Sequence, residues 1–277
     1  MKTINKSLVW LAATVLSLTL ISGSQADTVK QRTGKVVRIK GLARYSTGNK
    51  VWQPLKVGAI LRSGTVVQTS TDSYVDIVLS QEETAATVVV KPVAAYSASS
   101  SASGGGGGLL PAPDQDVIRV LDDSYLVFDS LSASDTGADT VTETLLDLKR
   151  GSIFGTVKKQ AATSRYEVKI PNGVAGIRGT IFMISANGNI ACLQGSVVAA
   201  HADANGNVVT KPIGAGQQYS ISSGVLSFIS TALNNTILAI AQQCSYSSGG
   251  PGGLPGGGGS GHGHHDHGPD IVSPTRP

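Results

Sequence analysis

Residues 165–182 read Arg-Tyr-Glu-Val-Lys-Ile-Pro-Asn-Gly-Val-Ala-Gly-Ile-Arg-Gly-Thr-Ile-Phe, and this stretch decides the fold. It opens with apolar Tyr166, Val168 and Ile170 alternating with charged side chains. Because neighbouring side chains on a strand point to opposite faces, this alternation predicts a strand with one buried face. Asn172-Gly173 follows at once and predicts a hairpin, since both residues tolerate the positive φ of a type I′ turn.

Two more Asn-Gly pairs predict hairpins for the same reason. Asn187-Gly188 is expected to join strands over 180–186 and 190–193, and Asn205-Gly206 strands over 196–200 and 208–211. These signals favour antiparallel pairing. The spaced glycines Gly173, Gly176 and Gly179 lack the Gly-Lys-Ser/Thr ending of a phosphate loop, so we interpret them as strand bends and close backbone approaches.

Short strand-like runs also precede this stretch, and they make the chain all-β. They alternate with turn residues from Gly34 to Pro92 and again after Val117, whereas Asp129 to Thr144, dense in Ser, Asp and Thr, is predicted to be a loop. The predicted fold is therefore all-β, with antiparallel sandwich or barrel-like sheets, one short C-terminal helix and a disordered tail.

Changes of composition divide the chain into segments. We predict a signal peptide (1–26), an N-terminal β region (27–93), a Ser/Gly/Pro-rich insertion (94–115), a second β region (116–225), an amphipathic helix (226–246) and a disordered Gly/Pro/His-rich tail (247–277). The helix is expected to cover an edge of the sheet.

The first residues indicate export. Lys2 and Lys6 precede an apolar run from Leu8 to Ile21, which is short for a membrane span and ends in small, polar residues. We therefore expect a cleaved signal peptide, no membrane span afterwards, and a periplasmic or secreted protein. Cleavage would remove two lysines and no acid, lowering the formal net charge from +4 to +2. With only 14% charged residues and no basic cluster, nucleic acid is not an expected partner.

No set of nucleophile and base is visible in the sequence. His201, the histidine outside the tail, lies among alanines in a predicted hairpin strand, and Asp122-Asp123 and Glu82-Glu83 are adjacent pairs that a strand would point to opposite faces. We therefore expect no enzyme and no cofactor.

The sequence contains one candidate metal site and one candidate disulfide. The tail gathers His262, His264, His265, Asp266 and His267, which can hold zinc or nickel weakly, because a flexible backbone supplies no preformed geometry. In an exported protein Cys192 and Cys244 can form a disulfide, while Cys192 can equally be a small buried hydrophobe.

The opening stretch resembles the signature of FecR domains, in which a strand and a Pro-x-Gly turn precede Arg-Gly-Thr-x-Phe, here Arg178 to Phe182. Leu148 to Phe154, Leu193 to Val197 and Gly214 to Gln218 resemble the flanking elements in the right order. Trp52 to Gly58 and its surroundings are similar to the beginning of such proteins and also to SH3-like modules.

The resemblance implies an envelope protein. In the best-known members this domain is the periplasmic sensor of a membrane regulator that controls a sigma factor; here only a few residues precede the apolar run, which implies a domain separated from that output. Our hypothesis is an exported, non-catalytic binding or structural module that recognises an envelope protein or glycan. The alternatives are a periplasmic sensing component of a sigma-factor or transport signalling system, and a weak metal-binding protein that uses the histidine tail.

Overall fold

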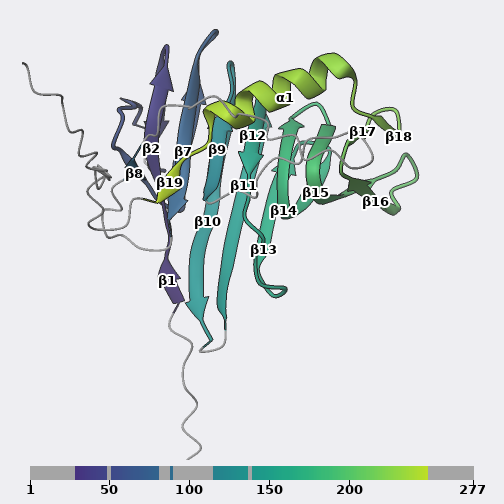
Figure 1. The fold of residues 1–277 in the computed structure, drawn as a ribbon, viewed down its shortest axis with the longest axis horizontal. Coiled ribbons are helices and arrows are strands. Elements are labelled where there is room, and N and C mark those ends of the chain that lie inside the picture. Colours follow the sequence, from purple (N-terminus) through teal and green to yellow (C-terminus); the bar gives the residue numbers. More distant parts are fainter. Residues whose placement is uncertain (1–28, 49–50, 81–87, 90–114, 137–138, 249–277) are drawn as a thin grey trace, which may run out of the picture.

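The computed structural model describes residues 29–48, 51–80, 88–89, 115–136 and 139–248. Within them, a 17-stranded sheet curls so that two halves face each other across a shared core (Figure 1). A separate two-stranded sheet pairs β8 (Val88–Val89) with β19 (Ser247–Ser248). The predicted all-β class is confirmed, in its barrel-like form.

One half of the sheet, here called the helix-covered half, packs against the helix. Its strands are β2 (Thr33–Lys40), β5 (Ile60–Leu61), β7 (Tyr74–Ser80), β9 (Asp116–Val120), β12 (Ser152–Thr156), β17 (Gln217–Ser220) and β18 (Val225–Phe228). Five of these strands pair in the order β5-β2-β7-β9-β12. The other two, β17 and β18, pair with each other, and β17 pairs with the long strand β15, which is described below.

The other half is called the open half. Its strands are β1 (Val29–Gln31), β3 (Ala43–Ser46), β4 (Gln53–Pro54), β6 (Val66–Thr69), β10 (Tyr125–Asp135), β11 (Thr140–Arg150), β13 (Arg165–Ile170) and β16 (Val208–Gly214). Six of these strands pair in the order β4-β3-β6-β10-β11-β13. The other two are β1, which pairs with β10, and β16, which pairs with β15. The pair β11–β13 is parallel, against the general antiparallel expectation.

Two long strands belong to both halves. The first part of β14 (Gly173–Ser185) pairs with β13 and its last part with β12, while β15 (Asn189–Ala202) pairs with β17 at its start and β16 at its end. Both strands bend where the register shifts between Arg178 and Phe182. Gly179 has a left-handed φ of 55° there, and a Cβ on the facing Gly195 would lie 2.3 Å from the carbonyl oxygen of Gly179. Only glycine fits this corner, because the backbones approach too closely for a side chain.

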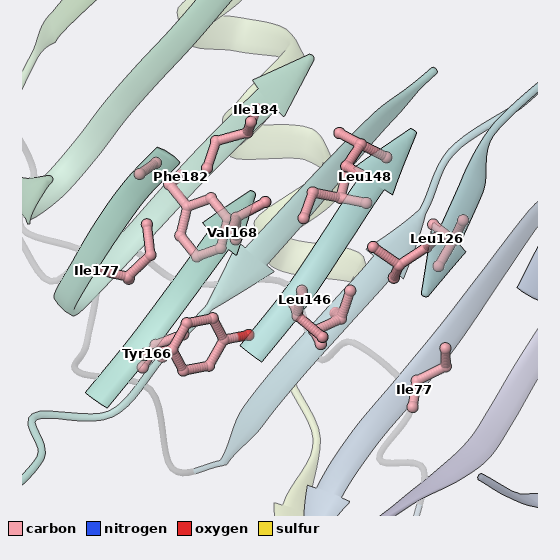
Figure 2. Close-up of a cluster of buried hydrophobic side chains, with 14 of the residues drawn as sticks. Ile77, Leu126, Leu146, Leu148, Tyr166, Val168, Ile177, Phe182 and Ile184 are labelled. Atoms are coloured by element: carbon pink, nitrogen blue, oxygen red, sulfur yellow. The ribbon is translucent and has the colours of Figure 1, made fainter. Parts of the chain in front are cut away.

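The core lies between the two halves. Figure 2 shows Leu126, Leu146 and Val168 of the open half in the same cluster as Ile77 and Phe182 of the helix-covered half. Tyr166 of β13 meets Phe182 edge to face, with 6.3 Å between ring centroids. The alternation first seen at Tyr166, Val168 and Ile170 is confirmed, since all three are buried.

Helix α1 (Thr231–Gln243) begins later than predicted, because β18 occupies Val225–Phe228. Ser230 caps it by accepting a hydrogen bond from the Leu233 N–H at 3.3 Å. It lies across a face of the sheet and not along an edge (Figure 1). The cluster beneath it comprises Val78, Val117, Phe154, Ile181, Ala191, Ile237, Ala241, Cys244 and Tyr246.

Two local predictions are wrong. The predicted loop from Asp129 to Thr144 forms most of a hairpin between β10 and β11, in which Leu131, Ala133 and Thr144 are buried. The Asn-Gly hairpins form, but not as type I′ turns, because among the described residues outside glycine only Asp72 and Asp123 have positive φ. At the second hairpin the Gly188 N–H donates to the Ser185 carbonyl at 2.9 Å, and the glycine alone is left-handed, as in a three-residue loop.

Candidate functional site

The outer face of the open half carries a row of polar and aromatic side chains. Directly opposite residues follow one another from Arg150 through Tyr125, Gln68 and Arg44 to Pro54, across β11, β10, β6, β3 and β4. Their strand neighbours Leu126 and Val67 are buried in the core, so the row points outward. With strands about 4.8 Å apart, its two arginines are separated by about 14 Å at their Cα atoms.

Trp52, from the segment before β4, packs on this row. The Arg44 guanidinium lies over its ring at 4.6 Å from the centroid, and Tyr125 meets it edge to face at 6.0 Å. We call Arg44, Trp52, Gln68, Tyr125 and Arg150 the Trp52 platform. Its members are half-buried or exposed, so the rings are held in place and still reach solvent.

Neutral acceptors hold both arginines of the Trp52 platform. Arg44 Nε donates to Gln68 Oε1 at 3.0 Å, and Arg150 Nε donates to the backbone carbonyl of Asp123 at 3.0 Å. Neither hydrogen bond cancels a positive charge. The platform therefore presents two guanidinium groups together with aromatic surface, a combination suited to anionic or polar partners.

A charged groove of about 460 Å³ lies on the same outer face, over β10, β11 and β13. Its lining includes Asp129, Arg165, Glu167 and Lys169. Arg165 Nε donates to Glu167 Oε1 at 2.7 Å, and this hydrogen bond raises the pKa of Arg165. Since both signs of charge are present and paired, the groove is nearly neutral overall.

On the helix-covered side, an ion pair lies buried under the end of α1. Asp76 of β7 accepts two hydrogen bonds from Arg119 of β9, at 2.5 and 2.7 Å. Tyr246 donates its hydroxyl to the same carboxylate at 2.7 Å, and Arg119 Nη1 donates to Gln243 Oε1 at 2.7 Å. Burial works to lower the pKa of Arg119, but the hydrogen bond to Asp76 and nearby charges raise it above its ordinary value. This network fastens the C-terminal segment to the sheet.

A second buried ion pair lies between Arg32 and Asp116, at 3.1 Å. Arg32 Nη1 also donates to Thr144 Oγ1 at 2.8 Å, and Asp116 Oδ1 accepts the Lys158 backbone N–H at 3.0 Å. These bonds tie β9 and the segment before β2 to β11 of the open half. Burial raises the pKa of nearby Tyr166 far above its ordinary range. Both ion pairs serve the packing of the sheet.

The candidate residues named from sequence do not gather into one site. Cys192 is buried in the core between the halves and Cys244 in the cluster under α1, and both are free thiols. Of the two alternatives that the sequence left open, the structure has the free, buried Cys192 and not the disulfide. The two thiols do not pair because their side chains lie on opposite sides of the sheet. Burial raises the pKa of Cys192 to about 11, so its thiol is protonated at neutral pH.

The other candidates fall on separate elements. His201 on β15 lies 2.8 Å from the Tyr219 hydroxyl through Nε2. The histidine tail with Asp266, the signal segment and Glu82-Glu83 lie outside the described residues. Within the described ranges, no group of three or more His, Cys, Asp or Glu side chains is placed to hold a metal ion. In that same part of the chain, no helix has the length and apolarity needed to cross a membrane.

Residues 110–198 match the family model described as FecR protein. The chain contains a FecR domain. The matched stretch of this FecR domain runs from the segment before β9 into β15, and it includes the sheet-switching corner. Gly179 of the Arg178–Phe182 stretch and Gly195 of the following element are the two glycines that face each other at that corner.

Two crystal structures of candidate anti-sigma factors from Parabacteroides distasonis ATCC 8503 superpose on parts of the FecR-containing chain. The 1.65 Å structure shares 12% identity over 47% of this chain and 58% of its own, with a TM-score of 0.34. The 2.50 Å structure shares 13% identity over 43% and 52%, with a TM-score of 0.31. The chain thus spans little more than half the length of these structures. No curated protein is similar enough in sequence to match.

The sequence does not reveal the Trp52 platform. Trp52 belongs to a FecR-like phrase, and its partners lie on strands that are far apart in the sequence, namely Arg44, Gln68, Tyr125 and Arg150. The alternation of side chains along each strand does indicate that Tyr125 and Gln68 face outward, because each is adjacent to a core residue. The register that aligns them was not readable.

Proposed function

We propose that this protein is an exported, non-catalytic FecR-domain module of the bacterial envelope, and that the outer face of its open half binds an envelope protein or glycan. The observation that carries the proposal is the Trp52 platform on that face. Helix α1 packs on the other half, so no described helix lies over the platform. Trp, Tyr and Arg are the residue types that most often dominate binding energy at interfaces.

The organisation of the platform supports binding. Trp52 is fixed between Arg44 and Tyr125, so little side-chain entropy remains to be lost when a partner covers it. Strand pairing holds the remaining members of the row in register. A rigid aromatic centre flanked by two arginines is a suitable anchor for a partner that carries carboxylate or other acidic groups.

The state of the buried titratable groups supports a non-catalytic role. Burial raises the pKa values of Cys244 and Tyr246 well above their ordinary values, and the carboxylate of Asp76 raises them further. Both groups are therefore protonated and unreactive at neutral pH. Asp76 is itself saturated with hydrogen bonds from Arg119 and Tyr246.

The FecR match favours a second candidate, a sensing component of a sigma-factor or transport signalling system. In that case the platform would dock on a membrane protein that carries the signal. The two candidates differ in the partner, a structural protein or glycan in one case and a membrane sensor in the other.

Site-specific photocrosslinking in cells tests the proposal. A photoreactive amino acid replaces Pro54, at the exposed end of the row, and in a matched control replaces Gln242, on the exposed side of α1. We expect a discrete adduct from position 54, none from position 242, and loss of the adduct when Trp52→Ala is added. Equal adducts at both positions, or an adduct that survives Trp52→Ala, would refute the docking face.

The nature of the adduct separates the candidates. Digestion with protease and, separately, with a peptidoglycan hydrolase shows whether the partner is protein or glycan. An adduct that consists only of a membrane sensor supports signalling. One that consists only of peptidoglycan supports the binding module.

A further inference from the structure

A pocket of about 430 Å³ lies on the helix-covered side, where the beginning of α1 meets β14, β15, β17 and β18. Met183 and Leu233 supply apolar surface to it. Ile190, Ala191, Tyr219 and Val225 line it as well. Uncharged polar side chains supply the smaller, hydrogen-bonding part of its surface, namely Ser185, Asn189, Gln218, Ser220, Ser223 and Ser227. Its volume is within the usual range for small-molecule sites.

The chemistry of this pocket is opposite to that of the similarly sized groove on the open half. Arg165, Glu167 and Lys169 line the groove, whereas none of the described residues that line the pocket is charged. Moving an ionised ligand out of water without a counter-charge is strongly unfavourable. The pocket therefore suits an uncharged ligand.

The polar atoms of the pocket are donors and acceptors at fixed places. Gln218 Nε2 donates to Ser227 Oγ at 3.2 Å and to the Phe228 carbonyl at 3.4 Å, which orients the amide and leaves its oxygen as an acceptor. Ser185 Oγ lies 2.7 Å from Ser152 Oγ. Serine hydroxyls both donate and accept, so they can match a ligand that bears several hydroxyl groups.

The frame around these atoms is built from paired strands. Gln218 lies opposite Ser227 and Ala191, and Ser220 lies opposite Val225 and Asn189, so the polar wall spans three hydrogen-bonded strands. The cap at Ser230 positions the first turn of α1, which brings Leu233 over the apolar side. The result is a pocket with one apolar side and one hydroxyl- and amide-rich side.

We propose that this pocket binds a neutral sugar residue. A pyranose ring has an apolar C–H face and a rim of hydroxyl groups, which correspond to the two sides of the pocket. This proposal is independent of the proposed function, because the Trp52 platform lies on the outer face of the other half. Either proposal can be refuted while the other holds.

Amide chemical-shift titration of the full chain with N-acetylglucosamine tests the proposal. We expect saturable shifts confined to residues 183–191, 218–220 and 225–233. Ser227→Trp places a ring at the mouth of the pocket from an exposed edge position and should weaken binding by about tenfold or more, about 1.4 kcal/mol. Thr210→Trp, also exposed but on the edge strand β16 of the open half, is the matched control and should bind like the unsubstituted protein.

Glucuronate serves as the charged probe of similar size. We expect it to bind at least about tenfold more weakly than N-acetylglucosamine, because the pocket offers no counter-charge. The proposal is overturned if both sugars bind equally, if binding survives Ser227→Trp, or if N-acetylglucosamine causes no localised shifts.

Discussion

The two outer faces of the curled sheet differ in how they treat charge. Under α1, Asp76 and Arg119 are almost fully buried, and each has several hydrogen-bond partners. On the open half, Arg44 and Arg150 are exposed, and the side-chain hydrogen bonds that they make within the described ranges go to neutral acceptors. A buried charge must be paired completely, whereas an exposed charge can remain available to a partner. The face under α1 is thus specialised for stability and the open face for contact.

The largest expected effect comes from breaking the buried pair. Asp76→Ala leaves the Arg119 guanidinium buried without its carboxylate, so we expect the free energy of unfolding to fall by about 3–5 kcal/mol in urea denaturation. Glu143→Ala on the open face removes an ion pair in which the Glu143 side chain is 40% exposed, and is the control. Its urea midpoint should stay unchanged within error. A similar loss in both variants would remove the contrast between the faces.

The corner that joins the two halves should be the next most sensitive position. Gly195→Ala forces a Cβ against the Gly179 carbonyl and strains a residue with a φ of 84°, so we expect a loss of about 2–3 kcal/mol. Gly206→Ala has nearly the same φ, 82°, but its Cβ would meet no atom within 4 Å. It should lose only about 1 kcal/mol, the strain of the left-handed conformation. Equal losses in thermal unfolding would show that close approach is irrelevant.

Alkaline pH should destabilise the folded protein, in part through two groups on the helix-covered side. The folded protein raises the pKa of Tyr246, chiefly by burial, above the ordinary 10.0, and that of Cys244 above the ordinary 9.0. These groups release protons on unfolding once the pH exceeds their unfolded values, so stability is retained below about pH 9 and falls above it. Each group adds a slope of about 1.4 kcal/mol per pH unit.

Urea denaturation between pH 8 and pH 11 measures this slope. Tyr246→Phe should show a shallower decline, together with a lower stability at pH 8 because Asp76 loses one donor. Tyr45→Phe is the control, since its hydroxyl bonds Gln53 in an exposed hydrogen bond. An unchanged slope in Tyr246→Phe would contradict the assignment.

The smallest effect on stability is expected at the Trp52 platform itself. Arg44→Ala removes the exposed cation–π contact with Trp52, for which about 0.5–1 kcal/mol is typical. The folded spectrum by near-ultraviolet circular dichroism should change only in the tryptophan band. A loss as large as that of Asp76→Ala would mean that the platform supports the fold and is not reserved for binding.

Local sequence patterns predicted much of the fold. Alternation found the strand at Tyr166 and Val168, and the three Asn-Gly pairs found their hairpins. The hairpin from Asp129 to Thr144 was not predicted because the buried Thr142 and Thr144, together with half-buried serines, give these strands the composition of a loop. The platform was not predicted for another reason: register between strands far apart in the sequence brings Arg44 and Tyr125 together, and local patterns do not carry that register.

Strands β6 and β7 lie before residue 110, yet they pair with β10 and β9 inside the FecR match. A fragment limited to residues 110–198 would leave unpaired the strand edges that carry Ile118 and Leu126, both fully buried in the intact chain. Exposed edges of this kind invite aggregation. For protein engineering, the segment that can be transplanted into another scaffold is therefore longer than the segment that matches the family model, and a recipient of the shorter segment must supply partner strands for β9, β10 and β15.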